Sequence, residues 1–366
     1  AWHDDGMSTT LTHADPTLDS TFRDVAQRPP IGPSLTGRPR LRTSASAPEN
    51  ALETDLDAER PRRLALSFEV IPPRSQAQAA TLPALLAELD TLAPDYLAVT
   101  SSAKSGWLHG TADFIRLVTA TTHLRPLAHL ACTAGTRAEL TTWIHHLLGV
   151  GVRGFLAIRG DFPDGATAVP DGHLPHADAL VHLLREIESA NTARLAAGRL
   201  GIGVAAYPSG HPESSGSDED LDVLAAKQRL GADFAITQLF FDPRAYADLR
   251  RRAELAGITI PLIPGVLPVT DPRRLHTMSR LSGLAVPDDL LRRFDGAADP
   301  ATARRIGLEM TAEHIAAILA GGADGLHIYT FNDQATTLDL LEMLDRLGIR
   351  LDSAPAPVPA SAPHPS

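Results

Sequence analysis

Eight short apolar segments, each followed by a segment with helical periodicity, recur between residues 63 and 351 of this 366-residue chain. The expected strands are residues 64–70, 96–100, 127–132, 154–158, 202–206, 234–238, 260–266 and 325–329. The expected helices are residues 82–92, 112–122, 137–148, 176–189, 218–231, 243–256, 272–281, 288–294, 301–320 and 336–347. Strands that are apolar on nearly every residue are typical of a parallel sheet with helices on its faces.

This alternation favours an α/β fold of the (β/α)8 TIM barrel type, since eight strand–helix units in about 290 residues match that barrel. A doubly wound open sheet is the alternative. The glycines Gly149, Gly151 and Gly154 match the spacing of a dinucleotide-binding loop, but they follow a helix and open a strand. That loop must instead lead from a strand into a helix, so these glycines indicate a helix end and a turn.

The chain divides into three expected parts. Residues 1–63 are rich in Thr, Ser, Pro, Asp and Arg without a sustained period, and we expect a disordered N-terminal extension or tag. Residues 64–351 form the barrel and carry the catalytic site. Residues 352–366 are rich in Pro, Ala and Ser and are expected to be a disordered tail.

Composition excludes several classes of function. The net charge of −11, without a basic cluster, argues against nucleic acid as a partner. No apolar run is long enough to span a membrane, and no secretory signal is recognisable, so we expect a cytoplasmic protein. Cys132 is the single cysteine, which excludes an internal disulfide and a cysteine-based zinc cluster. His145 and His146 lie in a helix without a companion ligand, so no metal site is expected.

Glu69 is the first candidate for chemistry. It lies near the end of the apolar strand LALSFEV, three residues before the proline pair Pro72 and Pro73, which cannot continue a strand ladder. Burial among apolar neighbours raises the pKa of a carboxyl group and suits a general acid. The alternative is a carboxylate at the rim of the barrel that forms a salt bridge with Arg74.

Polar side chains stand at the carboxyl ends of most of the expected strands. They are Glu69, Thr100, His129, Arg159 with Asp161, Tyr207 with His211, Gln238, and Tyr329 with Asn332. These strand ends converge on one face of a TIM barrel, where the active sites of this fold lie. A site with acids, a histidine, a glutamine and aromatic rings, but no metal cluster and no activated nucleophile, indicates that an organic cofactor supplies the chemistry.

These positions lie in segments that resemble the bacterial type of methylenetetrahydrofolate reductase. The matching segments are FEVIPPR, VTSSAKSG, AHLAC, AIRGD, VAAYPSGHPES, AAKQRLGADFAITQLFFD, LIPGVLPV and HIYTFN, in family order and over most of residues 64–347. The resemblance implies an oxidoreductase of one-carbon metabolism that binds FAD without a covalent bond. It also implies that NADH or NADPH and a folate use the same face of the flavin in turn, and that the chain forms a homo-oligomer.

The resemblance also implies roles for individual residues. Glu69 would be the general acid that protonates N10 of 5,10-methylenetetrahydrofolate and opens its five-membered ring, so that reduced flavin N5 can deliver hydride to the methylene carbon. Asp161 would tune the flavin and hold the pterin. The implied flavin-binding residues are Thr100, His129, Arg159, Gly160, Asp161, His176, Ala177, Tyr207, His211, Asp220, Lys227 and Tyr329. The implied substrate-binding residues are Glu69, Gln238, Phe240 and Tyr329, with Gln238 counted among the catalytic ones.

The chain departs from the family pattern at several positions. Asp333 stands where an arginine usually follows Asn332, and the loop of residues 101–111 lacks the usual glycine-rich run. Ser209, Val223 and His176 also replace common family residues. One alternative is therefore a divergent oxidoreductase of specialised metabolism, with a changed substrate or cofactor or without tightly bound FAD. A folate- or flavin-binding regulator without enzymatic activity is the other.

Overall fold

The computed structural model describes residues 64–102, 107–160, 169–195, 198–349 and 351. The predicted N- and C-terminal tails lie outside the described residues. Nine parallel strands form one sheet in the order β7-β6-β5-β4-β3-β2-β1-β9-β8. They are β1 (Ala65–Val70), β2 (Tyr96–Val99), β3 (Pro126–Ala131), β4 (Gly154–Ile158), β5 (Gly201–Ala206), β6 (Phe234–Thr237), β7 (Leu262–Ile263), β8 (Gly265–Val266) and β9 (Gly325–Tyr329).

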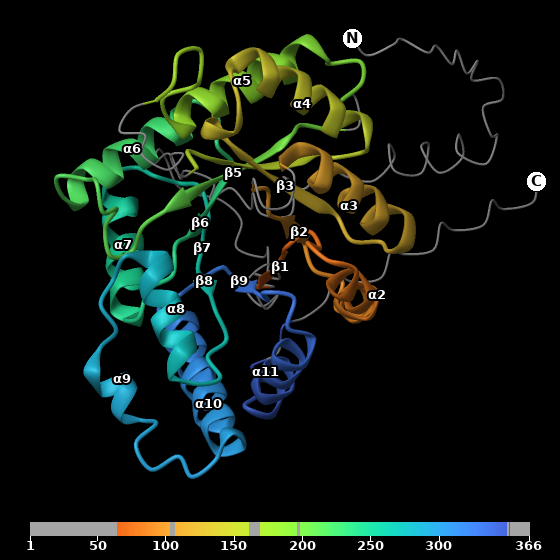
Figure 1. Ribbon diagram of the computed structural model, residues 1–366. Helices are drawn as coiled ribbons and strands as arrows, with labels where there is room; N and C mark the ends of the chain where they lie inside the picture. Colours follow the sequence, from red (N-terminus) through yellow and green to blue (C-terminus); the bar gives the residue numbers. More distant parts are fainter. Residues whose placement is uncertain (1–63, 103–106, 161–168, 196–197, 350, 352–366) are drawn as a thin grey trace, which may run out of the picture.

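Helices surround this sheet, and Figure 1 shows them on its outer side. They are α2 (Gln76–Thr91), α3 (Trp107–Thr121), α4 (Arg137–Gly149), α5 (Ala177–Ala190), α6 (Ser217–Arg229), α7 (Pro243–Leu255), α8 (Pro272–Ser282), α9 (Asp288–Arg292), α10 (Pro300–Ala320) and α11 (Gln334–Arg346), with a short 3-10 helix, η2 (Cys132–Ala134). The predicted (β/α)8 barrel is therefore confirmed. None of the helices in the described ranges is long and apolar enough to cross a membrane.

The strand predicted over residues 260–266 consists of two short strands, and together they bring the two ends of the sheet to each other. β7 pairs with β6, whereas β8 pairs with β9. Pro264 separates them, and its carbonyl oxygen accepts a hydrogen bond from the backbone N–H of His327 at 2.9 Å. A proline has no N–H to give to a ladder, which explains why the strand is interrupted where the chain passes from one neighbour to the other.

Alternating residues of the strands point into the barrel, where a small apolar cluster forms. This cluster comprises Ala65, Tyr96, Ala98, Leu127, Leu156, Phe234, Ile236 and Ile263. The residues between them on each strand pack outward in the larger cluster with the helices. On β1 the inward face carries Ala65, Ser67 and Glu69 in turn, because side chains alternate along a strand. The apolar layer therefore ends below Glu69.

Helix α2 begins earlier than the sequence predicts. The expected start at residue 82 rests on the helical spacing of the apolar residues from Leu82 onward. In the structure α2 begins at Gln76, after Ser75, whose hydroxyl accepts a hydrogen bond from the backbone N–H of Gln78. This N-cap, together with four buried leucines along the helix, stabilises it despite the internal proline.

Candidate active site

A pocket of about 580 Å³ opens at the carboxyl ends of the strands. Its volume lies within the range of small-molecule sites. Most of the predicted site residues line it, namely Glu69, His129, Arg159, Gly160, Tyr207, His211, Gln238 and Tyr329. Leu156 and Ile236 of the inner apolar cluster also line it, so the pocket lies directly on the barrel core.

Glu69 lies at the floor of the pocket with its side chain 16% exposed. The sequence predicts apolar neighbours, but the structure places two imidazoles beside the carboxylate. Glu69 Oε2 is 3.4 Å from Nε2 of His129 and 3.8 Å from Nε2 of His327. These histidines, and not Arg74, are its charged or titratable contacts among the described residues.

His327 is a site residue that the sequence analysis missed. It is fully buried in β9, and its Nδ1 lies 2.9 Å from Oγ of Ser67, its partner in the neighbouring strand β1. The candidate positions were the last residues of each strand, and His327 lies two residues before Tyr329. Period-2 alternation places the two on the same face of β9, and this signal could have identified His327.

The state of His129 follows from its surroundings. Burial lowers the pKa of His129 most strongly, the nearby Glu69 carboxylate raises it, and His327 lowers it further. The net direction is downward, so the imidazole is neutral at neutral pH. Nε2 of His129 and Nε2 of His327 are both buried without a hydrogen-bond partner in the described part of the chain. Both nitrogens can therefore serve a ligand or a protonated Glu69.

Tyr329 joins two sides of the barrel at the pocket wall. Its hydroxyl donates a hydrogen bond to the carbonyl oxygen of Thr237 at 3.0 Å, which ties β9 to β6. Burial raises the pKa of Tyr329 well above its usual range, and the Glu69 carboxylate adds to that shift. The phenol is neutral, and its ring lies edge-on to the ring of His327 with centroids 4.9 Å apart.

The opposite wall consists of the segments after β4 and β5. The guanidinium of Arg159 forms a two-point ion pair with Glu213, with one N–O distance of 2.9 Å. This hydrogen bonding lowers the pKa of Glu213. His211 accepts a hydrogen bond from the Glu213 backbone N–H at its Nδ1, and its ring meets Tyr207 edge-on at 4.6 Å.

Gly160 has a positive φ of 82°, and a Cβ added there would lie 2.3 Å from Oγ1 of Thr133. Glycine is therefore required where this wall meets the segment after β3.

Other predicted flavin-site residues do not line the pocket. The Thr100 carbonyl accepts a hydrogen bond from Thr111 Oγ1, and Asp220 accepts hydrogen bonds from the His211 backbone and the Ser214 hydroxyl. Lys227 is buried, donates to the Ala205 carbonyl at 3.3 Å, and has a pKa lowered by burial. The remaining members are His176, exposed before α5, and Ala177, buried at its start. Asp161 lies outside the described residues.

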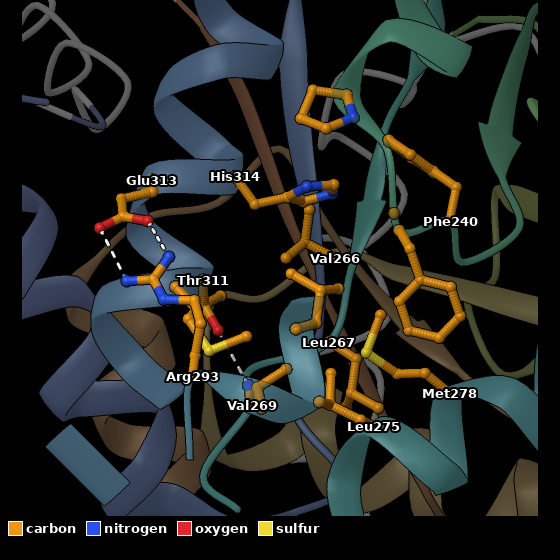
Figure 2. Close-up of a pocket in the computed structure, with 15 residues that line it drawn as sticks. Phe240, Val266, Leu267, Val269, Leu275, Met278, Arg293, Thr311, Glu313 and His314 are labelled. Carbon is orange, nitrogen blue, oxygen red and sulfur yellow. Dashed lines mark hydrogen bonds and ion pairs between the residues drawn. The ribbon is translucent and has the colours of Figure 1, made fainter. Parts of the chain in front are cut away.

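Phe240, predicted to contact substrate, lines a second cavity of about 220 Å³. Figure 2 shows this cavity between α8, α10 and the segment after β6. Its wall is mostly apolar, and the ring of His314 lies 5.1 Å from that of Phe240. Arg293 and Glu313 pair with each other at its edge. Phe240 follows Gln238 by two residues, but the two side chains line different cavities. Of the two, only Gln238 lines the barrel-mouth pocket.

Asp333 and Asn332 have structural roles. Asp333 caps α11 by accepting a hydrogen bond from the Thr336 backbone N–H, and it pairs with Arg274 at 3.3 Å. The Arg274 guanidinium lies 5.6 Å from the centroid of the Phe331 ring. The Asn332 amide exchanges two hydrogen bonds with the backbone of Ile71, at 2.9 and 2.7 Å, and so joins the ends of β9 and β1.

The described residues contain no group of three or more His, Cys, Asp or Glu side chains that could hold a metal ion. Glu69 and its two imidazoles can support acid–base chemistry, and Arg159, His211 and Gln238 line the same pocket.

Comparison with known proteins agrees with this arrangement. Residues 55–345 match the family model described as methylenetetrahydrofolate reductase. The 5,10-methylenetetrahydrofolate reductase of Pectobacterium carotovorum is 32% identical over 300 residues, which cover 81% of this chain and 94% of the relative. The enzyme of the same name from Escherichia coli K12 is 33% identical over 276 residues, covering 75% of this chain and 88% of the relative.

Among solved structures, an uncharacterised Clostridium thermocellum protein that binds two copies of 5-methyl-5,6,7,8-tetrahydrofolic acid has a TM-score of 0.50 at 13% identity. It covers 76% of this chain and 94% of its own length, and it supports the fold alone. The sequence matches, by contrast, are both long and specific. This chain belongs to the methylenetetrahydrofolate reductase family of oxidoreductases.

Proposed function

We propose that the chain reduces 5,10-methylenetetrahydrofolate to 5-methyltetrahydrofolate with electrons from NADH or NADPH, and that Glu69 is the general acid. The observation that carries this proposal is the position of Glu69 on the pocket floor, where two imidazoles flank its carboxylate. Family membership supports the reaction class. The floor position supports a role for this carboxylate in proton transfer.

The neutral state of His129 supports the role of Glu69. A general acid must carry its proton when the substrate binds, and a cation 3.4 Å away would favour the ionised carboxylate instead. Because burial keeps His129 uncharged, this imidazole places no positive charge beside the Glu69 carboxyl group. Glu69 can then donate to N10 of the substrate, and the ring opening leaves an electrophilic methylene carbon.

The residues present fit a bound flavin. The pocket offers a buried nitrogen on His129 that has no hydrogen-bond partner among the described residues, and the guanidinium of Arg159, which also pairs with Glu213. We propose that His129, Arg159, Gly160, Tyr207 and His211 hold FAD without a covalent bond. Bound FAD would accept electrons from the nicotinamide and pass them to the folate as hydride.

Gln238 has one side of its amide available to the substrate. Its Oε1 accepts a hydrogen bond from the Leu239 backbone N–H at 2.8 Å, which fixes the amide orientation. The NH2 group is then available as a donor into the pocket, and we propose that it contacts the pterin. Asp161 is proposed to hold the opposite edge of the pterin. In this scheme Tyr329 shapes the pocket wall, whereas Thr100 does not line the pocket.

The peripheral residues of the predicted flavin set need a separate test. We propose that Asp220, Lys227, His176 and Ala177 support the loops that hold FAD and do not contact it from the pocket wall.

The absorbance spectrum of the purified protein, with the released cofactor identified, tests whether FAD is bound at all. A colourless protein that FAD does not saturate would favour the divergent oxidoreductase instead.

The Glu69→Gln variant tests the acid. We expect folate reduction to fall by about 10²- to 10⁴-fold, the usual contribution of general acid catalysis. Oxidation of NADH or NADPH with an external quinone as acceptor should survive, because that half-reaction needs no proton from Glu69. Glu254→Gln, on the exposed surface of α7, is the matched control. Equal loss of both half-reactions in Glu69→Gln would contradict the assignment.

A further inference from the structure

The cavity between α8, α10 and the segment after β6 is separate from the barrel-mouth pocket. Its volume is about 220 Å³, and none of the described residues lines both cavities. An apolar cavity of about 150 Å³ in a protein interior is large enough to bind benzene. This cavity therefore has room for a small organic molecule of one or two rings.

The wall of this cavity favours an aromatic occupant. It includes the rings of Phe240 and Phe241. It also includes Met278 and Met310, two of the three methionines in the part of the chain that the structure describes. Thioether groups make favourable contacts with aromatic rings, and the flexible methionine side chain adapts to the shape of a ligand. A flat ring would thus find both aromatic and sulfur contacts here.

The polar side chains of the wall are already paired, with one exception. The hydroxyl of Thr311 makes two hydrogen bonds to backbone groups, at 2.9 and 2.8 Å. Arg293 and Glu313 form an ion pair with each other at the edge of the cavity. The exception is His314, which forms no hydrogen bond with any residue that the structure describes. Its ring nitrogens are therefore available to a ligand.

The orientation and charge of His314 suit such a contact. Figure 2 shows its imidazole extending from α10 toward the side of the cavity that Phe240 forms, and the two rings lie 5.1 Å apart at 49°. Burial lowers the pKa of His314 to about 4, so the imidazole is neutral at neutral pH. A neutral imidazole has one N–H donor and one acceptor nitrogen. A ligand can thus gain a hydrogen bond here without bringing a charge into an apolar cavity.

We propose that this cavity binds a small, uncharged aromatic molecule of one or two rings, with His314 as its hydrogen-bond partner. The side chains of Arg293 and Glu313 are 38% and 60% exposed, so the cavity reaches the surface at their edge. Because these two charges neutralise each other, they offer no net attraction to an ionic ligand. The cavity is also smaller than the sites of drug-sized ligands, which excludes a flavin or a folate as its occupant.

Calorimetric titration of the purified full chain with three probes tests this inference. The probes are indole, indene, which has the same shape without the N–H group, and indole-3-carboxylate, which adds a charge. The wild type should bind indole with a Kd of about 1 mM or lower, and the carboxylate at least about tenfold more weakly. In His314→Phe we expect indole binding to weaken about three- to tenfold, the effect of one hydrogen bond, while indene binding is retained. His145→Gln, on the exposed face of α4, is the matched control and should bind both probes as the wild type does.

The variant Leu290→Trp tests where the probe binds. Leu290 lines the cavity and is only partly buried, so a larger ring there should fill the cavity and abolish indole binding. Thermal unfolding shows whether each variant is folded, and the comparison of indole with indene in His314→Phe stands even if Leu290→Trp is not. Three outcomes would overturn the inference: no saturable indole binding to the wild type, undiminished binding to a folded Leu290→Trp protein, and equal losses of indole and indene in His314→Phe.

Discussion

At the scale of single residues, Ser67 holds the imidazole that flanks the proposed acid. Its hydroxyl is 2.9 Å from Nδ1 of the fully buried His327, whose Nε2 faces Glu69. In Ser67→Ala this ring nitrogen loses its partner, and we expect the free energy of unfolding to fall by about 1–3 kcal/mol. Urea denaturation measures this, and the exposed Ser189→Ala should change little. Unchanged stability in Ser67→Ala would show that water or another group replaces the hydroxyl.

Single residues also show what the sequence could and could not reveal. Glu69, His129 and Gln238 were identified because they interrupt apolar strands at positions that a barrel brings together. His327 was accessible to the same reasoning through alternation along β9. The position of Arg280 at the pocket was not, because it depends on where the end of α8 lies, and helical periodicity indicates only that this arginine can be exposed. Burial of Lys227 likewise depends on tertiary packing.

At the scale of elements, the close packing of β8 against β6 and β9 depends on Gly265. A Cβ added there would lie 2.5 Å from the Thr237 carbonyl oxygen and 2.6 Å from the Tyr329 ring. That oxygen is the acceptor for the Tyr329 hydroxyl, so Gly265→Ala should disturb the link between β9 and β6. We expect a loss of about 1–3 kcal/mol in the free energy of unfolding, typical of an overpacked core.

The matched control for this element is Gly149→Ala. Gly149 is the last residue of α4, where an added Cβ has room and approaches only the Arg194 side chain, at 3.5 Å. Since alanine favours helices more than glycine does, this variant should be equally or slightly more stable. Thermal unfolding of both variants and of the wild type measures these differences in stability. A Gly265→Ala protein as stable as the wild type would mean that β8 can move away from Thr237 without cost.

Element boundaries were predictable to different degrees. The bounds of β4 and β9 coincide with the predicted ones, because apolar runs there are bounded by glycines and polar residues. The divided strand at residues 262–266 was not predicted, because its apolar pattern is continuous. Its division depends on how the barrel closes, since β7 pairs with β6 and β8 pairs with β9. The early start of α2 depends on the N-cap Ser75, which lies before the apolar periodicity that predicted this helix.

At the scale of the whole molecule, the two cavities share walls. The segment after β6 contributes Gln238 to the barrel-mouth pocket and Phe240 to the apolar cavity, and α8 contributes Arg280 to the first and Met278 to the second. A satellite apolar cluster, which includes Leu239 and Met278, lies between these elements. The packing of that cluster therefore helps to fix the position of the last turn of α8 at the pocket mouth. A change in this packing should also change the stability of the carboxyl-terminal part of the barrel.

His314 makes the stability of this region dependent on pH. Burial lowers its pKa from 6.5 to about 4, and the Asp242 carboxylate only partly opposes that shift. Because the folded state holds His314 neutral, its unfolded form binds the proton more readily. The associated stability is complete above about pH 6.5 and is lost as the pH falls toward 4, by at most about 3 kcal/mol.

The variant His314→Phe should remove that dependence. Phenylalanine keeps a ring against Phe240 and carries no proton, so the free energy of unfolding should decline less steeply between pH 6.5 and 4.5 than in the wild type. Urea denaturation at several pH values in that range measures the slope. His145→Gln, on the exposed face of α4, should retain the wild-type slope. If His314→Phe retains it as well, the acid sensitivity of this protein arises elsewhere, and the cavity wall around His314 must admit enough water to solvate a charged imidazole.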